Sequence, residues 1–145
     1  GHANNVIPDF ANLAGTIRYF DKSTGEFIRK KFPKIVNDIC EAFGAKAEID
    51  YNAGYPPTIN DANSAKFALE TAKEIAGTQA SEGQEPMMGS EDFSYFLQEK
   101  PGAYAWIGNG NSASLHNPSY DFNDEILPIG ASFLSRIAEK ALGKN

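Results

Sequence analysis

A histidine in a polar loop is the side chain of this sequence best suited to metal chemistry. His116 lies in the string SLHNP at residues 114–118, between a glycine-rich turn and an acidic stretch at 121–125. A catalytic zinc-type site takes three or more ligands from His, Cys, Asp or Glu and keeps one position open for water. The residues alone leave two interpretations of His116 open, a metal ligand and a hydrogen-bonded loop histidine.

The other histidine and the cysteine do not complete such a site. Cys40 falls on the apolar face of an expected helix, where it acts as a small hydrophobic residue. His2 stands beside Gly1 at the start of the chain, and no role can be assigned to it. Because HxxxH and CxxC spacings are absent, spacing alone builds no metal site. The start without methionine leads us to expect a piece of a longer protein.

Two carboxylates, an arginine and an asparagine are further candidates. Glu91 and Asp92 stand at an expected helix start, where acidic residues are also favoured by the helix dipole. Arg18 interrupts an alternating apolar pattern, and its planar fork of donors suits carboxylate recognition. Asn5 precedes it by thirteen residues. For both of these, an ordinary surface position is the alternative.

Other catalytic classes find no support in the sequence. A serine nucleophile would need a GxSxG elbow, and a phosphate site would need a GxGxxG or P-loop pattern; neither occurs. Gly108-Asn109-Gly110 is interpreted as a turn, because no helix is expected directly after it. Covalent catalysis and nucleotide binding are therefore not expected.

Composition limits the partners and the compartment. The 145 residues are 41% hydrophobic, so they can bury a core, and the net charge of −6 disfavours nucleic acid and anionic membranes as partners. No apolar run reaches the length of a membrane span. One cysteine allows no internal disulfide, which fits a reducing compartment, so we expect a cytoplasmic protein.

Hydrophobic periodicity and turn residues predict a boundary near residue 56. The first segment reads β-β-α-β and the second α-α-β-α. A single helix against so few strands makes a thin core, so the first segment is expected to pack on a partner. The expected strands are 5–7, 11–20, 47–51 and 103–107; the expected helices start at a capping box of Ser23 and Glu26, at Asn60 or Asp61, at Ser90 and at about Leu127, and Gly44 and Gly77 close the first two.

Six strings occur in one collinear order. They are NVIPD at 5–9, GTIR at 15–18, GYPP at 54–57 with Asn60-Asp61, MGSEDFSYF at 88–96, PGAY at 101–104, and LHNP at 115–118 continuing to LPIG at 127–130. Each string alone is weak, but together they span nearly the whole chain. The sequence resembles the hippurate hydrolase and N-acyl-amino-acid amidohydrolase branch of the aminoacylase and carboxypeptidase metallopeptidases, which includes plant hydrolases of indole-acetic-acid conjugates.

The resemblance implies an α+β and α/β architecture in two parts. Residues 1–56 resemble the second half of a ferredoxin-like lid of the dimerisation type, with β-β-α-β order, inserted into a catalytic domain. Residues 57–145 resemble the C-terminal part of that catalytic domain, an α/β dinuclear-metal peptidase. In the intact enzyme the family holds two divalent ions, and Zn, Mn, Co and Ni all suit His and carboxylate ligands.

The resemblance also assigns residues. His116 matches the last metal ligand of the family, and Asn5 and Arg18 match lid positions that hold substrate. Gly89, Glu91 and Asp92 match a motif at the active-site rim. The remaining ligands of the family and its general-base glutamate match nothing in this chain. No catalytic residue, and no tight metal binding by the chain alone, is therefore expected.

By this resemblance, the parent protein hydrolyses N-acyl amino acids, peptides or similar small conjugates, and the chain alone is inactive. Two alternatives stay open. One is a related dipeptidase or deacylase of the same superfamily. The other is a non-enzymatic α+β interaction module that forms a homodimer through the edges of its lid strands.

Overall fold

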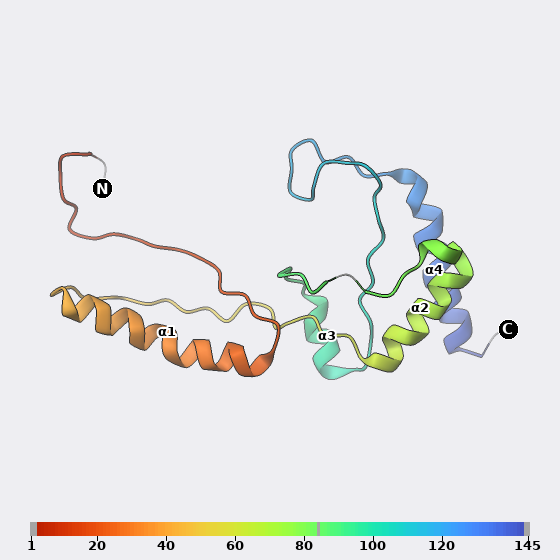
Figure 1. Ribbon diagram of the computed structural model, residues 1–145, viewed down its shortest axis with the longest axis horizontal. Helices are drawn as coiled ribbons and strands as arrows, with labels where there is room; N and C mark the ends of the chain where they lie inside the picture. Colours follow the sequence, from red (N-terminus) through yellow and green to blue (C-terminus); the bar gives the residue numbers. More distant parts are fainter. Residues whose placement is uncertain (1–2, 84, 144–145) are drawn as a thin grey trace. The chain divides into compact units, whose positions relative to one another are not determined.

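The computed structural model describes residues 3–83 and 85–143 and divides the chain into two compact units. The first unit ends at Tyr51 and the second begins at Asn52. No helix in the described residues has the length and apolar character needed to span a membrane. The regular elements are α1 (Lys22–Ala42), α2 (Ala62–Ala76), η1 (Gly77–Gln79), α3 (Phe93–Glu99), η2 (Asp124–Ile126) and α4 (Leu127–Ala141) (Figure 1).

The N-cap of α1 lies two residues before the predicted cap. Asp21 is the N-cap, and its Oδ1 accepts a hydrogen bond of 2.8 Å from the backbone N–H of Thr24. The capping box predicted from Ser23 is wrong, because the Ser23 hydroxyl instead donates to Asp21 Oδ1 at 2.5 Å. These bonds, with that of Ser23 foremost, lower the pKa of Asp21 from 3.8 to about 2.

The end of α1 follows the sequence. Gly44 has a φ of 70°, a left-handed conformation that glycine adopts without steric cost. Its N–H donates to the carbonyl of Glu41 at 3.0 Å, and the N–H of Ala45 donates to the carbonyl of Cys40 at 2.8 Å. This is a Schellman motif, so the predicted stop is confirmed.

The predicted strands are not formed. Residues 5–7, 11–20, 47–51 and 103–107 are coil, and no strand occurs in residues 3–83 and 85–143. Figure 1 shows the two coil segments of the first unit running along α1. A strand needs a ladder of backbone hydrogen bonds, and none joins these two segments within the described part of the chain. The β-β-α-β order of a half lid is therefore not confirmed.

Two aromatic contacts hold these segments against α1. The rings of Phe32 and Tyr51 lie 6.1 Å apart between centroids. The ring of Tyr19 covers Gly25 so closely that a Cβ atom at position 25 would collide with it. Gly25 is buried for this reason. Side-chain contacts thus replace the expected backbone ladder.

The second unit begins with a helix that the sequence placed correctly. Asp61 is the N-cap of α2, and its Oδ1 accepts from the N–H of Ser64 at 2.8 Å. The hydrogen bonds from Ser64, the backbone bond first, lower the pKa of Asp61. Gly77, with a φ of 56°, ends the helix as predicted. The cap and the stop of α2 are both confirmed.

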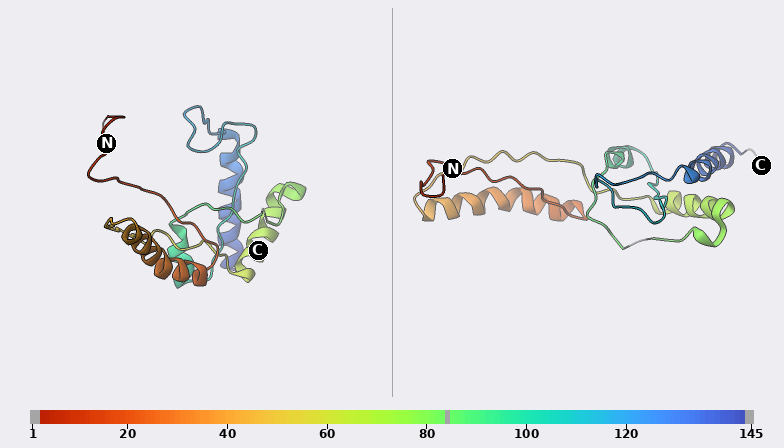
Figure 2. Two further views of the ribbon diagram at one scale, coloured as in Figure 1. Left: turned by 60° about the vertical axis from the view of Figure 1, so that its left-hand side comes forward. Right: turned by 90° about the horizontal axis from the view of Figure 1, so that it is seen from above.

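The core of the second unit lies between α2 and α4, which run side by side (Figures 1 and 2). Thr71 is fully buried there and donates its hydroxyl hydrogen to the carbonyl of Phe67 at 2.9 Å. Glu74 of α2 bridges two cations of α4, at 2.9 Å from Arg136 Nε and 2.6 Å from Lys140 Nζ. Because these pairs are partly exposed, they add little to stability.

Large apolar side chains are exposed in both units. On α1 the exposed fraction is 60% for Phe27 and 55% for Ile39, and Trp106 of the second unit is 63% exposed. In the described residues the one buried hydrophobic residue is Ala68. The composition allows the chain to bury a core, but the described residues bury little apolar surface. Their apolar faces have the character of surfaces that a further part of a protein covers.

Candidate active-site loop and rim

His116 occupies a strained turn. The N–H of Asn117 donates to the carbonyl of Ser114 at 3.1 Å, which closes a β-turn over residues 114–117. His116 has a φ of 64° at the third position, the only positive φ of a non-glycine residue in the described chain. A type II turn requires that sign there and normally places glycine or asparagine at this position. For other residues the strain costs about 1–3 kcal/mol.

The ring of His116 is accessible. The residue is exposed, and its imidazole makes no hydrogen bond or ion pair with residues 3–83 or 85–143. A second turn follows, in which Asn117 Oδ1 accepts from the N–H of Ser119 at 2.8 Å and the carbonyl of Asn117 accepts from the N–H of Tyr120 at 2.9 Å. Two successive turns therefore form the tip of the loop and present the imidazole to solvent.

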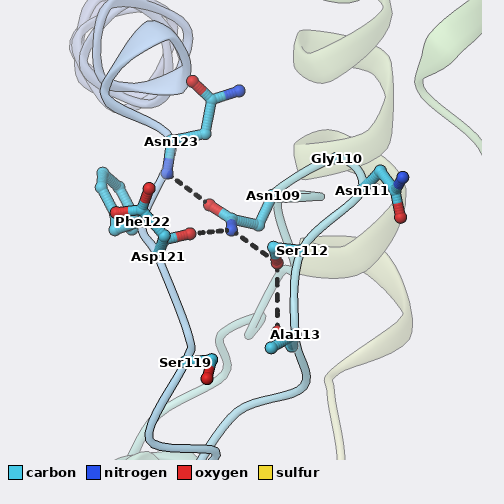
Figure 3. A pocket seen from close by; sticks show the side chains of 9 residues that line it. All are labelled: Asn109, Gly110, Asn111, Ser112, Ala113, Ser119, Asp121, Phe122 and Asn123. Carbon is cyan, nitrogen blue, oxygen red and sulfur yellow. Dashed lines mark hydrogen bonds between the residues drawn. The ribbon is translucent and has the colours of Figure 1, made fainter.

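One asparagine joins the two legs of this loop. Asn109 Nδ2 donates to the carbonyl of Asp121 at 2.7 Å, and Asn109 Oδ1 accepts from the N–H of Asn123 at 2.8 Å. The same Nδ2 donates to Ser112 Oγ at 2.9 Å. Figure 3 shows the Asn109 side chain reaching from one leg to the other. We call residues 109–123 the His116 loop and these bonds of Asn109 the clasp.

The clasp cannot be recognised in the sequence, whose pattern predicts only a turn in this stretch. The only local signal is the repeated Gly-Asn pair at 108–111. A hollow of about 500 Å³ lies between the legs, open to solvent and mostly polar. Its walls are Asn109, Gly110, Asn111, Ser112, Ala113, Ser119, Asp121, Phe122 and Asn123 (Figure 3).

Glu91 is held by hydrogen bonds as an anion. The hydroxyl of Tyr104 donates to Glu91 Oε2 at 2.9 Å, and the N–H of Asp92 donates to Glu91 Oε1 at 3.1 Å. The bond from Tyr104, followed by that from Asp92, lowers the pKa of Glu91. The same bond to Glu91, with partial burial, raises the pKa of Tyr104. Because α3 begins at Phe93 with Asp92 as N-cap, the cap predicted at Ser90 is wrong.

The backbone of Tyr104 is held by the side-chain amide of Asn60. Asn60 Nδ2 donates to the carbonyl of Tyr104 at 2.9 Å, and Asn60 Oδ1 accepts from the N–H of Tyr104 at 2.8 Å. Asn60 thereby takes the place of the neighbouring strand that the sequence predicted for residues 103–107. The Tyr104 ring packs between Phe93, at 5.8 Å, and Trp106, at 5.4 Å between centroids. Tyr104 is thus held on three sides and positions Glu91.

The remaining predicted site residues lie in exposed coil. Asn5 and Arg18 are exposed residues of the first unit. Gly89 is exposed in the second unit, and no heavy atom beyond its chain neighbours lies within 4 Å of where a Cβ would stand. Glu91 and Asp92 are neighbours in the sequence, and the bond between them joins the Asp92 backbone N–H to the Glu91 carboxylate. That Glu91 and Asp92 share one active site with His116 stays a prediction. The same holds for Asn5 and Arg18 of the first unit.

The donor side chains of the described residues form no complete metal centre, and His116 fits a single ligand position. In residues 3–83 and 85–143 no three His, Cys, Asp or Glu side chains are grouped to hold an ion. An exposed imidazole in a loop suits a single coordination position. These residues by themselves do not fit two metal ions, so no reaction step through a metal is derived from them.

Comparison with known proteins places these features in a family. The model of "Peptidase family M20/M25/M40" matches residues 5–140. A hippurate hydrolase of Campylobacter jejuni is 39% identical over 98% of this chain and 37% of its own length. The IAA-amino acid hydrolase ILR1-like 4 of Arabidopsis thaliana is 31% identical over 98% of this chain and 34% of its own length. The N-acetylcysteine deacetylase of Bacillus subtilis is 28% identical over 95% of this chain and 36% of its own length. The chain spans about a third of the length of these relatives.

Proposed function

Because this chain belongs to peptidase family M20/M25/M40, we propose that it is the C-terminal part of a metal-dependent amidohydrolase acting on N-acyl amino acids or similar conjugates. The match to the family confirms the resemblance that the sequence motifs indicated. Peptidases of this family are generally dependent on two metal ions. The observation that carries the proposal is the 39% identity to a hippurate hydrolase over 98% of the chain.

In this proposal His116 supplies one metal ligand. The left-handed conformation supports it, because strained backbone persists mainly where function requires it. The accessible ring supports it too, since a neutral imidazole must offer one nitrogen to the ion. When bound, two such ions supply a polarised amide carbonyl and a water of lowered pKa. The other ligands belong to a part of the protein outside this chain, so the chain alone is inactive.

Substrate recognition in the proposal involves both units. Arg18 binds the free carboxylate of the substrate through its two parallel N–H donors, and Asn5 lies near the scissile carbonyl. Gly89, Glu91 and Asp92 line the rim of the active site. The hydrogen bond from Tyr104 supports this role for Glu91, because it keeps one carboxylate ionised in a fixed orientation.

The first unit has two extended segments that form no backbone ladder in its described residues, which supports the assignment of a lid. Residues 1–56 form the second half of a ferredoxin-like lid, whose sheet is completed by strands from the rest of the protein or from a second copy. A half lid leaves its strands without neighbouring strands and its apolar side chains exposed. The coil segments along α1, which form no ladder, and the exposed Phe27 and Ile39 fit this expectation. Residues 57–145 form the C-terminal part of the catalytic domain.

Hydrolysis by the full-length protein tests the proposal. N-acetyl and N-benzoyl amino acids are assayed with and without chelator, each beside the same compound with its carboxylate amidated. We expect metal-dependent hydrolysis with a preference for the free carboxylate, and loss of that preference in Arg18→Gln. Faster release of N-acetyl or dipeptide substrates would favour the deacylase or dipeptidase alternative. A stable homodimer without any hydrolysis would favour the interaction module.

A further inference from the structure

The clasp of Asn109 is the structural device that closes the His116 loop. Both bonds across the loop go to backbone groups, the carbonyl of Asp121 and the N–H of Asn123, twelve and fourteen residues away. In the described structure, no other hydrogen bond joins residues 109–113 to residues 119–123. One side chain therefore sets where the two legs of the loop meet.

The tip of the loop depends on those legs. His116 sits in a left-handed turn, which an L-residue keeps only when the surrounding structure enforces it. The turns over 114–117 and 117–120 are local, and neither fixes the tip relative to α4. The clasp does, because Asn123 is the N-cap of η2, and η2 leads directly into α4. The imidazole is thus tied to a packed helix through Asn109.

We propose that Asn109 is a positioning residue, which holds the His116 loop in the geometry that metal coordination needs. The proposal rests on the proposed function, in which His116 is a ligand. Asn109 does not touch the metal or the substrate; it acts through the backbone of the loop. Partners that orient a metal ligand change metal affinity by about 10–100-fold when they are removed. We expect a loss of that size for one of the two ions.

The amide group is needed because the clasp uses it as both donor and acceptor. Aspartate at position 109 keeps the acceptor for the N–H of Asn123 but loses both donors, and it places a carboxylate beside the carbonyl of Asp121. Alanine loses all three bonds. Ser112→Ala removes one bond within the first leg and leaves the two bonds across the loop. Asn111, exposed and without a hydrogen bond to the described residues, provides a matched asparagine control.

The experiment compares Asn109→Ala, Asn109→Asp, Ser112→Ala and Asn111→Ala in the full-length protein. Zinc affinity is measured by competition with a chromogenic chelator, and amide hydrogen exchange is measured over residues 109–123. We expect both Asn109 variants to bind one zinc ion about 10–100-fold more weakly, with the two controls within about twofold of the wild type. Exchange at the N–H of Asn123 should rise in the alanine variant and stay slow in the aspartate variant, which retains its acceptor.

The outcomes separate this inference from the function on which it rests. Wild-type zinc affinity in both Asn109 variants overturns the positioning role, even where His116→Ala removes an ion. Wild-type affinity in His116→Ala overturns the proposed function instead. If the alanine variant does not fold, the aspartate variant decides, because it replaces only the NH2 group of Asn109 by a carboxylate oxygen and keeps the bond to Asn123. A zinc loss in Asn111→Ala equal to that of Asn109→Ala also contradicts the specific role of the clasp.

Discussion

Replacing His116 by glycine and by alanine separates the backbone of the turn from the chemistry of the ring. Both variants lose the imidazole, but only glycine adopts a φ of 64° without steric cost. A left-handed conformation costs an L-residue about 1–2 kcal/mol. Glycine in turn loses about 0.5–1 kcal/mol more than alanine in conformational freedom on folding. The difference leaves the glycine variant about 0.5–1 kcal/mol more stable.

The assay is urea denaturation of both variants as metal-free proteins. Bound metal must be removed first, because a ligand of the native state adds its own binding free energy to the stability. Equal slopes with urea concentration show that the two variants expose the same surface on unfolding, so that the midpoints report stability. His116→Asn is the matched third variant, since asparagine tolerates the left-handed region, and it should lie between the other two.

An alanine variant as stable as the glycine variant, or more stable, would refute the reasoning. It would mean that position 116 is not left-handed in solution, and the strain that supports a functional role for His116 would be absent. A glycine variant that keeps full zinc binding would refute the claim that the His116 imidazole is a metal ligand. The pair thus tests the conformation and the chemistry of one residue independently.

Three further predictions concern other parts of the chain. Gly25→Ala should destabilise the first unit by about 1–3 kcal/mol in denaturant unfolding, because the new methyl group meets the ring of Tyr19, and Tyr19→Ala should relieve that loss. The pKa of Asp21 is lowered from 3.8 to about 2, so the ionised carboxylate stabilises the fold above its ordinary pKa, and this stabilisation is lost as the pH falls through about 2. The melting temperature of Asp21→Asn should therefore fall less with acidification than that of the wild type. An equally steep decline in both proteins would contradict this role of Asp21. Tyr104→Phe should raise the pKa of Glu91 toward its ordinary value in carbon-13 NMR titration, and an unchanged titration would exclude the hydrogen bond.

The features that sequence predicted well are those whose causes are local. Asp61 caps α2 and Gly77 ends it, and Gly44 closes α1, because each side chain or conformation satisfies backbone groups within one turn. The cap at Asp21 was missed in favour of Ser23, although both are good N-cap residues, since the choice depends on where the first helical hydrogen bond forms.

Features that depend on distant partners could not be predicted from the pattern. Residues 11–20 alternate as a strand does, but an alternating segment forms a ladder only where a neighbouring strand is present. Within residues 103–107, the backbone of Tyr104 bonds instead to the side chain of Asn60, which lies forty-four residues away. The clasp of Asn109 likewise uses backbone groups twelve and fourteen residues away, and a string of glycines and asparagines does not name them.

The resemblance predicts the role of His116, and the structure adds two properties of this residue that the sequence does not show. Sequence spacing alone does not identify His116 as a ligand, because HxxxH and CxxC spacings are absent. The strained turn and the accessible ring are properties of the fold, and neither is visible in the string SLHNP. Family membership and local conformation therefore support the same residue on independent grounds.

The metal content of the purified full-length protein, measured by mass spectrometry beside that of His116→Gly, shows directly whether the imidazole holds an ion. We expect two divalent ions per chain in the wild type and the loss of one in the variant, with the fold retained. Equal metal content in the two proteins would contradict it, because the imidazole at position 116 would then hold no ion.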